Sequence, residues 1–130
     1  MLSECRKALR ITTEAYDGEL CSLMNAGARD LAIAGVQLPG TVSFTLVSTT
    51  TGTGNNQVTE TYYRDDSTLN DALCVRAIFT YVRMHFGSPD DWERVRESYN
   101  IQKTQLMHAT GYTDYGEDEE TEPEEDGEGE

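Results

Sequence analysis

Apolar residues are concentrated in one stretch of the chain, from Leu69 to Gly87. On a helical wheel its apolar side chains cover most of the circumference, and Arg76, Thr80 and Arg83 form a polar stripe on one side. A helix that is apolar on most sides is a buried helix. The pattern therefore predicts a central helix of about five turns against which the other elements pack. Its stripe faces solvent, an acidic partner or a neighbouring subunit.

Two helices are predicted before this stretch. Residues 3–10 predict a short helix with Ser3 as its cap. A longer helix then runs to about Ala34, with acidic residues in its first turns, and Gly35 is placed to end it in a left-handed conformation. Gly27 lies on the apolar face of this helix, so we expect a neighbouring helix to approach closely there.

A last helix follows the central one and runs to about Met107. Ser88 is its predicted N-cap, followed by a proline at the first position and the pair Asp90-Asp91 in the first turn. A metal site or an acid–base dyad is the alternative role for that pair, but capping explains it fully. The candidates for the cap of the central helix are Asp66, Ser67 and Thr68.

The segment at about residues 37–64 changes character, because it is rich in Thr and Gly and has few helix formers. Its first part has apolar residues at every second position, at Val42, Phe44 and Leu46. This alternation is typical of a half-buried strand. Residues 57–64 form a second β-rich run, and residues 49–56 between the runs read as a turn. We expect a β-hairpin with a loose tip.

The acidic character of the chain belongs mainly to its C-terminal end. The sequence has 130 residues and a net charge of −14. Residues 114–130 hold 11 of the 24 acidic residues and no base, which leaves 13 acidic against 10 basic residues in the rest. Such a tail does not fold alone. The body has no basic surplus to neutralise phosphates, which argues against a conventional nucleic-acid binder.

These patterns predict one mainly α domain at residues 1–111. We expect a small helical bundle, with a short N-terminal helix and three longer helices, an inserted β-hairpin at about 37–64 and an acidic, extended C-terminal tail at 112–130. No signal peptide is expected, and no stretch approaches the roughly 18 apolar residues that a membrane span needs. We therefore expect a soluble protein made in a cytoplasm.

The sequence offers no arrangement of catalytic residues. Cys5, Cys21 and Cys74 are widely spaced and are expected to be reduced, buried thiols. His85 and His108 stand alone at helix ends, where a structural role is expected. No hydrolase, nucleotide-binding or zinc motif is present. We predict no catalytic, cofactor-binding or metal-binding residue, and we do not expect an enzyme.

Two stretches resemble a known family. Residues 5–20, CRKALRITTEAYDGEL, resemble the N-terminal signature of the head–tail connector (adaptor, or head-completion) proteins of tailed bacteriophages. Residues 76–106, RAIFTYVRMHFGSPDDWERVRESYNIQKTQL, resemble that family's second signature: an apolar helix that ends in an aromatic-Gly pair, then an Asp-rich turn and a further helix. The order and the spacing agree with the family, whereas the hairpin is longer than the family's usual connection.

The resemblance implies a virion structural protein of the neck, at the head–tail interface, assembled in the host cytoplasm. Members of the family form a homo-oligomeric ring, usually of twelve subunits, beneath the portal protein. The ring binds the stopper (head-completion) or tail-joining protein, and double-stranded DNA passes through its channel without sequence-specific binding. No catalysis, cofactor or membrane is implied.

The candidate subunit interface consists of Arg76, Thr80, Arg83, Phe44 and Tyr62. The alternative for Arg76, Thr80 and Arg83 is an ordinary stripe that faces solvent. In an interface, the arginines pair with acidic residues across the subunit boundary or in the hairpin, where the candidates are Glu60, Asp65 and Asp66. The candidate portal-docking residues lie in the tail: Tyr112, Tyr115, Glu117, Asp118, Glu119 and Glu120. The alternative function is an acidic DNA mimic or a small regulatory binding protein, whose tail competes for a basic site.

Overall fold

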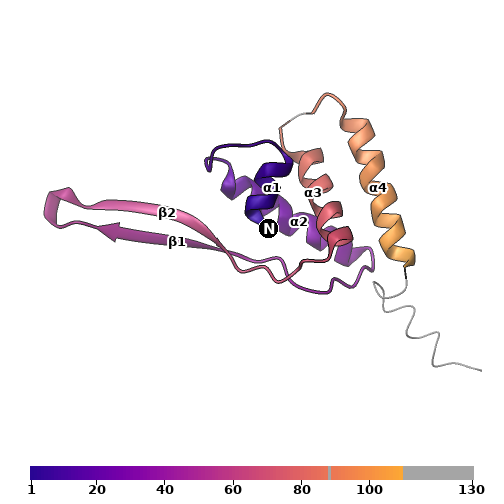
Figure 1. Ribbon diagram of the computed structural model, residues 1–130, viewed down its shortest axis with the longest axis horizontal. Coiled ribbons are helices and arrows are strands. Elements are labelled where there is room, and N and C mark those ends of the chain that lie inside the picture. Colours follow the sequence, from indigo (N-terminus) through magenta and orange to yellow (C-terminus); the bar gives the residue numbers. More distant parts are fainter. Residues whose placement is uncertain (88, 110–130) are drawn as a thin grey trace, which may run out of the picture.

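Four helices and a two-stranded hairpin make up the described part of the chain, residues 1–87 and 89–109 of a computed structural model (Figure 1). In chain order the elements are α1 (Leu2–Ala8), α2 (Asp17–Ile33), β1 (Phe44–Thr51), the 3-10 turn η1 (Gly54–Asn56), β2 (Val58–Asp65), α3 (Ala72–His85) and α4 (Trp92–His108). The predicted architecture, a mainly α bundle with an inserted β-hairpin, is confirmed. The predicted tail lies outside the described residues.

Helix α3 packs against both α2 and α4, while α1 packs against α2. The buried apolar side chains are Leu2, Cys5, Leu20, Cys21, Met24, Leu31, Val36, Leu69, Cys74, Ala77, Ile78, Val82, Met84, Val95, Tyr99 and Leu106. Helix α3 supplies five of them, which is the largest share of any element. The predicted central position of this helix is therefore correct.

The surroundings of Gly27 explain why a glycine occupies the apolar face of α2. A methyl group on its Cα would come within 3.1 Å of Cδ1 of the Tyr81 ring. The predicted close approach to a neighbouring helix is confirmed, and the helix is α3. The predicted end of α2 is also correct, since Gly35 has a φ angle of 101°.

The starts of the helices differ from the prediction. Helix α1 begins at Leu2, so Ser3 lies inside it and caps nothing. Helix α3 begins after Asp71, whose carboxylate accepts a hydrogen bond of 3.1 Å from the Cys74 amide. Helix α4 begins after Asp91, without a side-chain cap. The predicted cap Ser88 lies outside the described residues; Asp91 occupies the N-cap position, but its carboxylate binds Arg83 and makes no cap hydrogen bond.

The residues predicted to cap α3 instead join the two ends of the hairpin. The Ser67 hydroxyl accepts a hydrogen bond from the Ser43 amide at 3.0 Å. The Thr68 hydroxyl accepts one from the Thr41 amide at 2.9 Å. The Asp66 amide donates to the Ser43 carbonyl at 2.9 Å. The two hydroxyls satisfy backbone groups where the β ladder ends, and the Asp66 carboxylate binds Thr45 and Arg64, so none of the three side chains is available to α3.

The hairpin projects from one end of the helical bundle (Figure 1). Its strands pair antiparallel over eight residues each, from Phe44 opposite Asp65 to Thr51 opposite Val58. At about 3.4 Å per residue the ladder is roughly 27 Å long. The turn between the strands needs a left-handed residue, which Gly52 supplies with a φ angle of 95°.

The predicted burial of the first strand is wrong for its outer part. Phe44 and Tyr63 are half-buried against the core, but Leu46 is 55% exposed and Tyr62 is 52% exposed. The reason is that only the base of the hairpin has a helix beside it, where the Tyr63 hydroxyl lies next to Gly18 of α2. The alternating pattern gives the faces of a strand, but it does not say whether a second layer covers one of them.

Candidate functional site

The described residues contain no cluster of three or more His, Cys, Asp or Glu side chains that could hold a metal ion. No helix among them is long and apolar enough to cross a membrane. The three cysteines are free and buried, as predicted. Burial raises the pKa of Cys5 to about 12, of Cys21 to about 11 and of Cys74 to about 12, so these thiols are unreactive near neutral pH.

The predicted polar stripe forms a ridge on α3. Arg76 and Arg83 are exposed and Thr80 is half-buried. The Thr80 hydroxyl donates a hydrogen bond of 2.9 Å to the carbonyl of Arg76, one turn earlier in the same helix. Arg83 donates from Nη2 to Asp91 at the start of α4, at 3.3 Å. The structure therefore brings the three residues together on one side of α3.

Among the described residues, the predicted hairpin acids Glu60, Asp65 and Asp66 do not pair with these arginines. Asp65 binds the N-terminal ammonium of Met1 at 2.6 Å, and Asp66 binds Arg64 at 2.9 Å. Asp65, the last residue of β2, lies beside α1, and Asp66, which follows β2, binds Arg64 of that strand, so neither acid is held beside the stripe. The predicted pairing inside the chain is wrong for both; pairing across a subunit boundary stays a prediction.

A groove lined largely by apolar residues lies on one side of the ridge, between α1 and α3. Three adjoining hollows of about 430, 250 and 500 Å³ share lining residues and form this α1–α3 groove. Its apolar walls are Ala8, Leu9, Ala72, Val75, Phe79 and Phe86. Val75 and Phe79 are only half-buried. The groove exists because α1 packs on α2 and leaves this side of α3 open.

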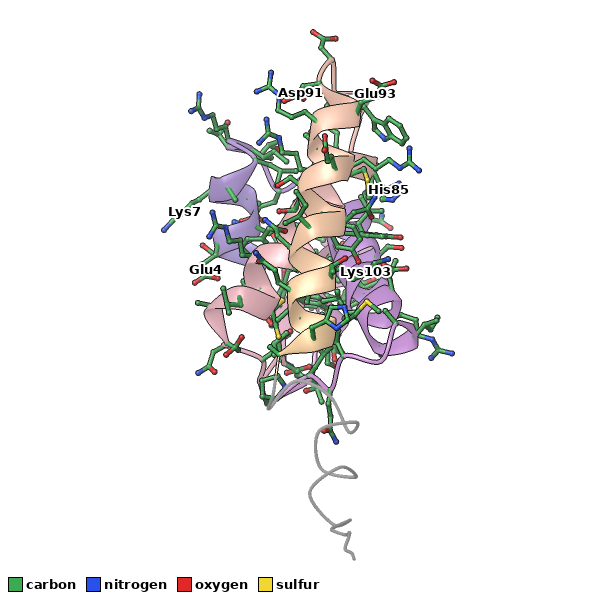
Figure 2. All side chains as sticks on the ribbon, turned by 90° about the vertical axis from the view of Figure 1, so that its right-hand side faces the viewer. Glu4, Lys7, His85, Asp91, Glu93 and Lys103 are labelled. Atoms are coloured by element: carbon green, nitrogen blue, oxygen red, sulfur yellow. The ribbon has the colours of Figure 1, made fainter. Side chains whose placement is uncertain are left out.

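A second groove lies on the other side of the ridge, between α3 and α4. Its upper hollow lies near the start of α4, has a volume of about 200 Å³ and is lined by Thr80, Arg83, Asp91, Arg94, Val95 and Ser98. Its lower hollow lies near the end of α4, has a volume of about 160 Å³ and is lined by Leu73, Arg76, Gln102, Gln105, Leu106 and Ala109. Figure 2 shows α4 in front of this region, with Asp91 and Glu93 at its beginning and Lys103 farther along.

The two grooves correct the prediction that α3 is buried on most sides. Leu73 is 53% exposed, and the ridge together with the walls of both grooves is open to solvent. Two helices, α2 and α4, cover only part of a helix whose apolar residues extend around most of its circumference. An apolar helix face without a neighbour inside the chain is a candidate for contact with another chain.

The open face of α3 carries a positive charge excess. Arg10, Arg76, Arg83 and Arg94 line the grooves, which is four of the ten basic residues of the chain. The acidic residues lining the same hollows are Glu4 and Asp91. The face is therefore basic on a chain that is acidic overall.

The hairpin offers a separate surface, on which exposed apolar side chains lie among polar ones such as Glu60 and Thr49. Tyr62 lies opposite Val47 in the ladder, and Val58 is four residues earlier than Tyr62 in the same strand. The three side chains therefore point to one face. Tyr62 and Val58 are each 52% exposed. Phe44, the other predicted contact residue of the hairpin, is half-buried against the core of its own chain. Sequence reasoning missed Val47 and Val58, although their strand parity with Tyr62 identifies them.

An ionic contact fixes the base of the hairpin to α1. The Asp65 carboxylate accepts hydrogen bonds from the Met1 ammonium at 2.6 Å, the Leu2 amide at 2.9 Å and the Ser67 amide at 3.0 Å. Burial alone would raise the pKa of Asp65, but these hydrogen bonds lower the pKa to about 2. The carboxylate therefore stays ionised at neutral pH and holds the base of the hairpin against α1.

No family model, curated protein or solved structure matches the chain. The two signature-like stretches nevertheless coincide with the open face. Residues 5–20 include the α1 side of the α1–α3 groove, and residues 76–106 include the ridge and most of the α3–α4 groove. The predicted portal-docking residues, Tyr112 to Glu120, lie outside the described residues.

Proposed function

We propose that this chain is a structural assembly protein, a head–tail connector that forms a ring beneath the portal protein of a tailed bacteriophage. The observation that carries the proposal is the presence of two dissimilar surfaces in different parts of the molecule. The hairpin, which carries the exposed apolar side chains of Leu46, Val58 and Tyr62, projects from one end, and the open α3 face lies on the helical bundle (Figure 1). A closed ring of identical subunits needs two different, complementary surfaces on each subunit.

In this proposal the α3 face of one subunit receives a neighbouring subunit. Its exposed apolar side chains become buried only in the ring, which supplies the driving force for assembly. Arg76 and Arg83 then meet acidic groups of the neighbour. The hairpin reaches a neighbouring subunit or the adjoining ring through the face that carries Val47, Val58 and Tyr62.

The proposal also includes the partners of the ring. The acidic tail docks on a basic groove of the portal protein, through Tyr112, Tyr115 and the acids Glu117 to Glu120. A stopper or tail-joining protein binds the opposite rim, and double-stranded DNA passes through the channel. The protein would act in the neck of the virion after assembly in the host cytoplasm. The proposal requires no catalysis and no cofactor.

Electron microscopy of the full chain mixed with its cognate portal ring tests this function. We expect a second ring stacked coaxially on the portal. A protein that stays monomeric, leaves the portal bare and displaces DNA from a basic protein would instead be a DNA mimic, and the connector proposal would be wrong.

The role of the ridge has its own test. Arg83→Glu reverses the charge at one position of the ridge, removes the positive excess of the face and should reduce ring formation. It also removes the ion pair with Asp91, so Asp91→Asn is the matched control, because it removes the same pair without reversing the charge. Normal rings from Arg83→Glu would show that the stripe is simply solvated.

A further inference from the structure

We propose that residues 110–130 bind the open face of α3 in the same chain, along the α3–α4 groove. This contact does not depend on the connector function. It is inferred from where the described chain ends, from the charge of the groove and from an unsatisfied group in the groove.

The described chain ends inside the proposed binding site. Ala109, its last residue, lines the lower hollow of the α3–α4 groove together with Arg76 and Leu73. Residues that follow Ala109 therefore start beside the exposed apolar side chain of Leu73 and the first arginine of the ridge. The segment needs no long connection to reach this groove.

The order of residues in the segment matches the order of groups along the groove. Tyr112 comes first, within reach of the apolar lower hollow, and Asp114 is five residues beyond Ala109. At about 3.3 Å per extended residue, Asp114 reaches up to roughly 16 Å, which is enough to meet Arg76. Glu117 and its acidic neighbours reach roughly 26 Å or more. Arg83 lies about 10 Å farther along α3 than Arg76.

The charges of the two surfaces are complementary. Residues 114–130 carry 11 acidic residues and no base, whereas Arg76, Arg83 and Arg94 line the groove. Arg83 already has one contact, through Nη2, to Asp91. A guanidinium has five N–H donors, so this pair leaves others for the segment.

The groove also contains a polar atom that lacks a partner among the described residues. Oε1 of Gln102 is buried and accepts no hydrogen bond there. Gln102 lines the same lower hollow as Ala109. A buried acceptor is nearly always satisfied in a native protein. A backbone amide of the segment lying in this hollow would donate to it.

Covalent attachment makes even a weak contact significant. A short tether gives an effective concentration on the order of millimolar, so a groove with millimolar affinity is about half occupied in the same chain. If the connector function is correct, the segment covers in the free subunit the face that the ring later buries. A neighbouring subunit would then displace it and release it for the portal.

Paramagnetic relaxation in the full chain tests the contact. Gly116→Cys is labelled with a nitroxide; the native cysteines are buried and stay unlabelled. At half occupancy we expect amide signals of residues 73–83 to lose about two-fold or more in intensity, and those of residues 22–29 on α2 to change little. At about 1 M salt, where the Debye length is about 3 Å, the effect should weaken strongly.

Charge variants show whether the arginines provide the site. Arg76→Gln, Arg83→Gln and Arg94→Gln together should remove the broadening. The matched control is Arg29→Gln, Arg64→Gln and Arg96→Gln, which changes the net charge equally outside the groove and should preserve the broadening. Uniform or absent broadening in the native sequence would refute the proposal.

A mixing experiment distinguishes the same chain from a second copy. Isotope-labelled chain without the nitroxide is mixed with unlabelled chain that carries it. No broadening is expected in this mixture. Broadening of residues 73–83 would mean that the segment binds another copy, and the proposal of contact within one chain would be wrong. Neither result depends on ring formation, so failure here is separate from failure of the connector function.

Discussion

Gly27→Ala tests the packing of α2 on α3, because two effects of opposite sign meet at this position. Alanine favours a helix over glycine by about 1 kcal/mol. The added methyl group, however, would lie 3.1, 3.2 and 3.3 Å from three atoms of the Tyr81 side chain. Such distances are shorter than ordinary carbon–carbon contacts of about 3.5–4.0 Å.

The sign depends on whether Tyr81 can move away. Its ring is held on two sides, by His85 with ring centroids 4.4 Å apart and by Tyr99 at 5.4 Å. Tyr99 is itself buried and hydrogen-bonded to Asp30. Overpacking a held side chain costs about 1–3 kcal/mol. We therefore expect Gly27→Ala to lower the free energy of unfolding by about 1 kcal/mol after the gain in propensity.

Urea denaturation followed by circular dichroism measures this effect, and a double-mutant cycle checks its cause. In a Tyr81→Ala background the clash is absent, so Gly27→Ala should stabilise the protein or leave it unchanged. Ala32→Gly, at an exposed position of the same helix, measures the propensity term alone. An increase in stability from Gly27→Ala in the native background would refute the argument that Tyr81 is held.

Three further substitutions test the base of the hairpin and the core. Asp65→Asn should cost about 1 kcal/mol at neutral pH after screening by solvent. The pKa of Asp65 is lowered from 3.8 to about 2, so its contribution to the free energy of unfolding is complete above pH 3.8 and is lost as the pH falls towards 2. The difference in free energy of unfolding between the native chain and the variant should therefore shrink over this interval. Gly40→Ala would place a methyl group 2.7 Å from Cα of Leu69, so the ends of the hairpin must separate, and backbone amide exchange at Thr41 and Thr68 should accelerate. Tyr99→Phe removes the hydrogen bond to Asp30 and should cost about 1–2 kcal/mol in urea denaturation, whereas equal stability would mean that water replaces the hydroxyl.

The helices were predictable because their signals are local. The apolar periodicity of α2 and α3, the left-handed Gly35 and the crowded Gly27 depend on neighbouring positions along the chain or on one helix contact. Helix starts were less predictable, because several Ser, Thr and Asp residues precede α3 and each is a plausible cap. Tertiary contacts decide between them: the hairpin base uses Ser67 and Thr68, which leaves Asp71 for the helix.

The surfaces were predictable only in part. The ridge of Arg76, Thr80 and Arg83 follows from helical spacing, and the structure assembles it as expected. The α1–α3 groove beside it does not follow, since it depends on α1 packing against α2 instead of α3. The exposure of Leu46 and Tyr62 was also unpredictable, because strand alternation does not reveal whether a second layer exists.

The open α3 face exposes the free protein to non-specific association, and the acidic residues at its C-terminal end counteract this. Exposed apolar grooves on an unassembled subunit favour non-specific association. The strong negative charge of residues 114–130 opposes this by repulsion between subunits, and binding of the same residues to the ridge would also cover the α3–α4 groove. Such binding would weaken with added salt, whereas the apolar contacts of a ring would not. Because Arg76 and Arg83 would also meet acidic groups of the neighbouring subunit, the two proposals together predict that assembly of the native chain depends more strongly on salt than assembly of the Arg76, Arg83 and Arg94 variant.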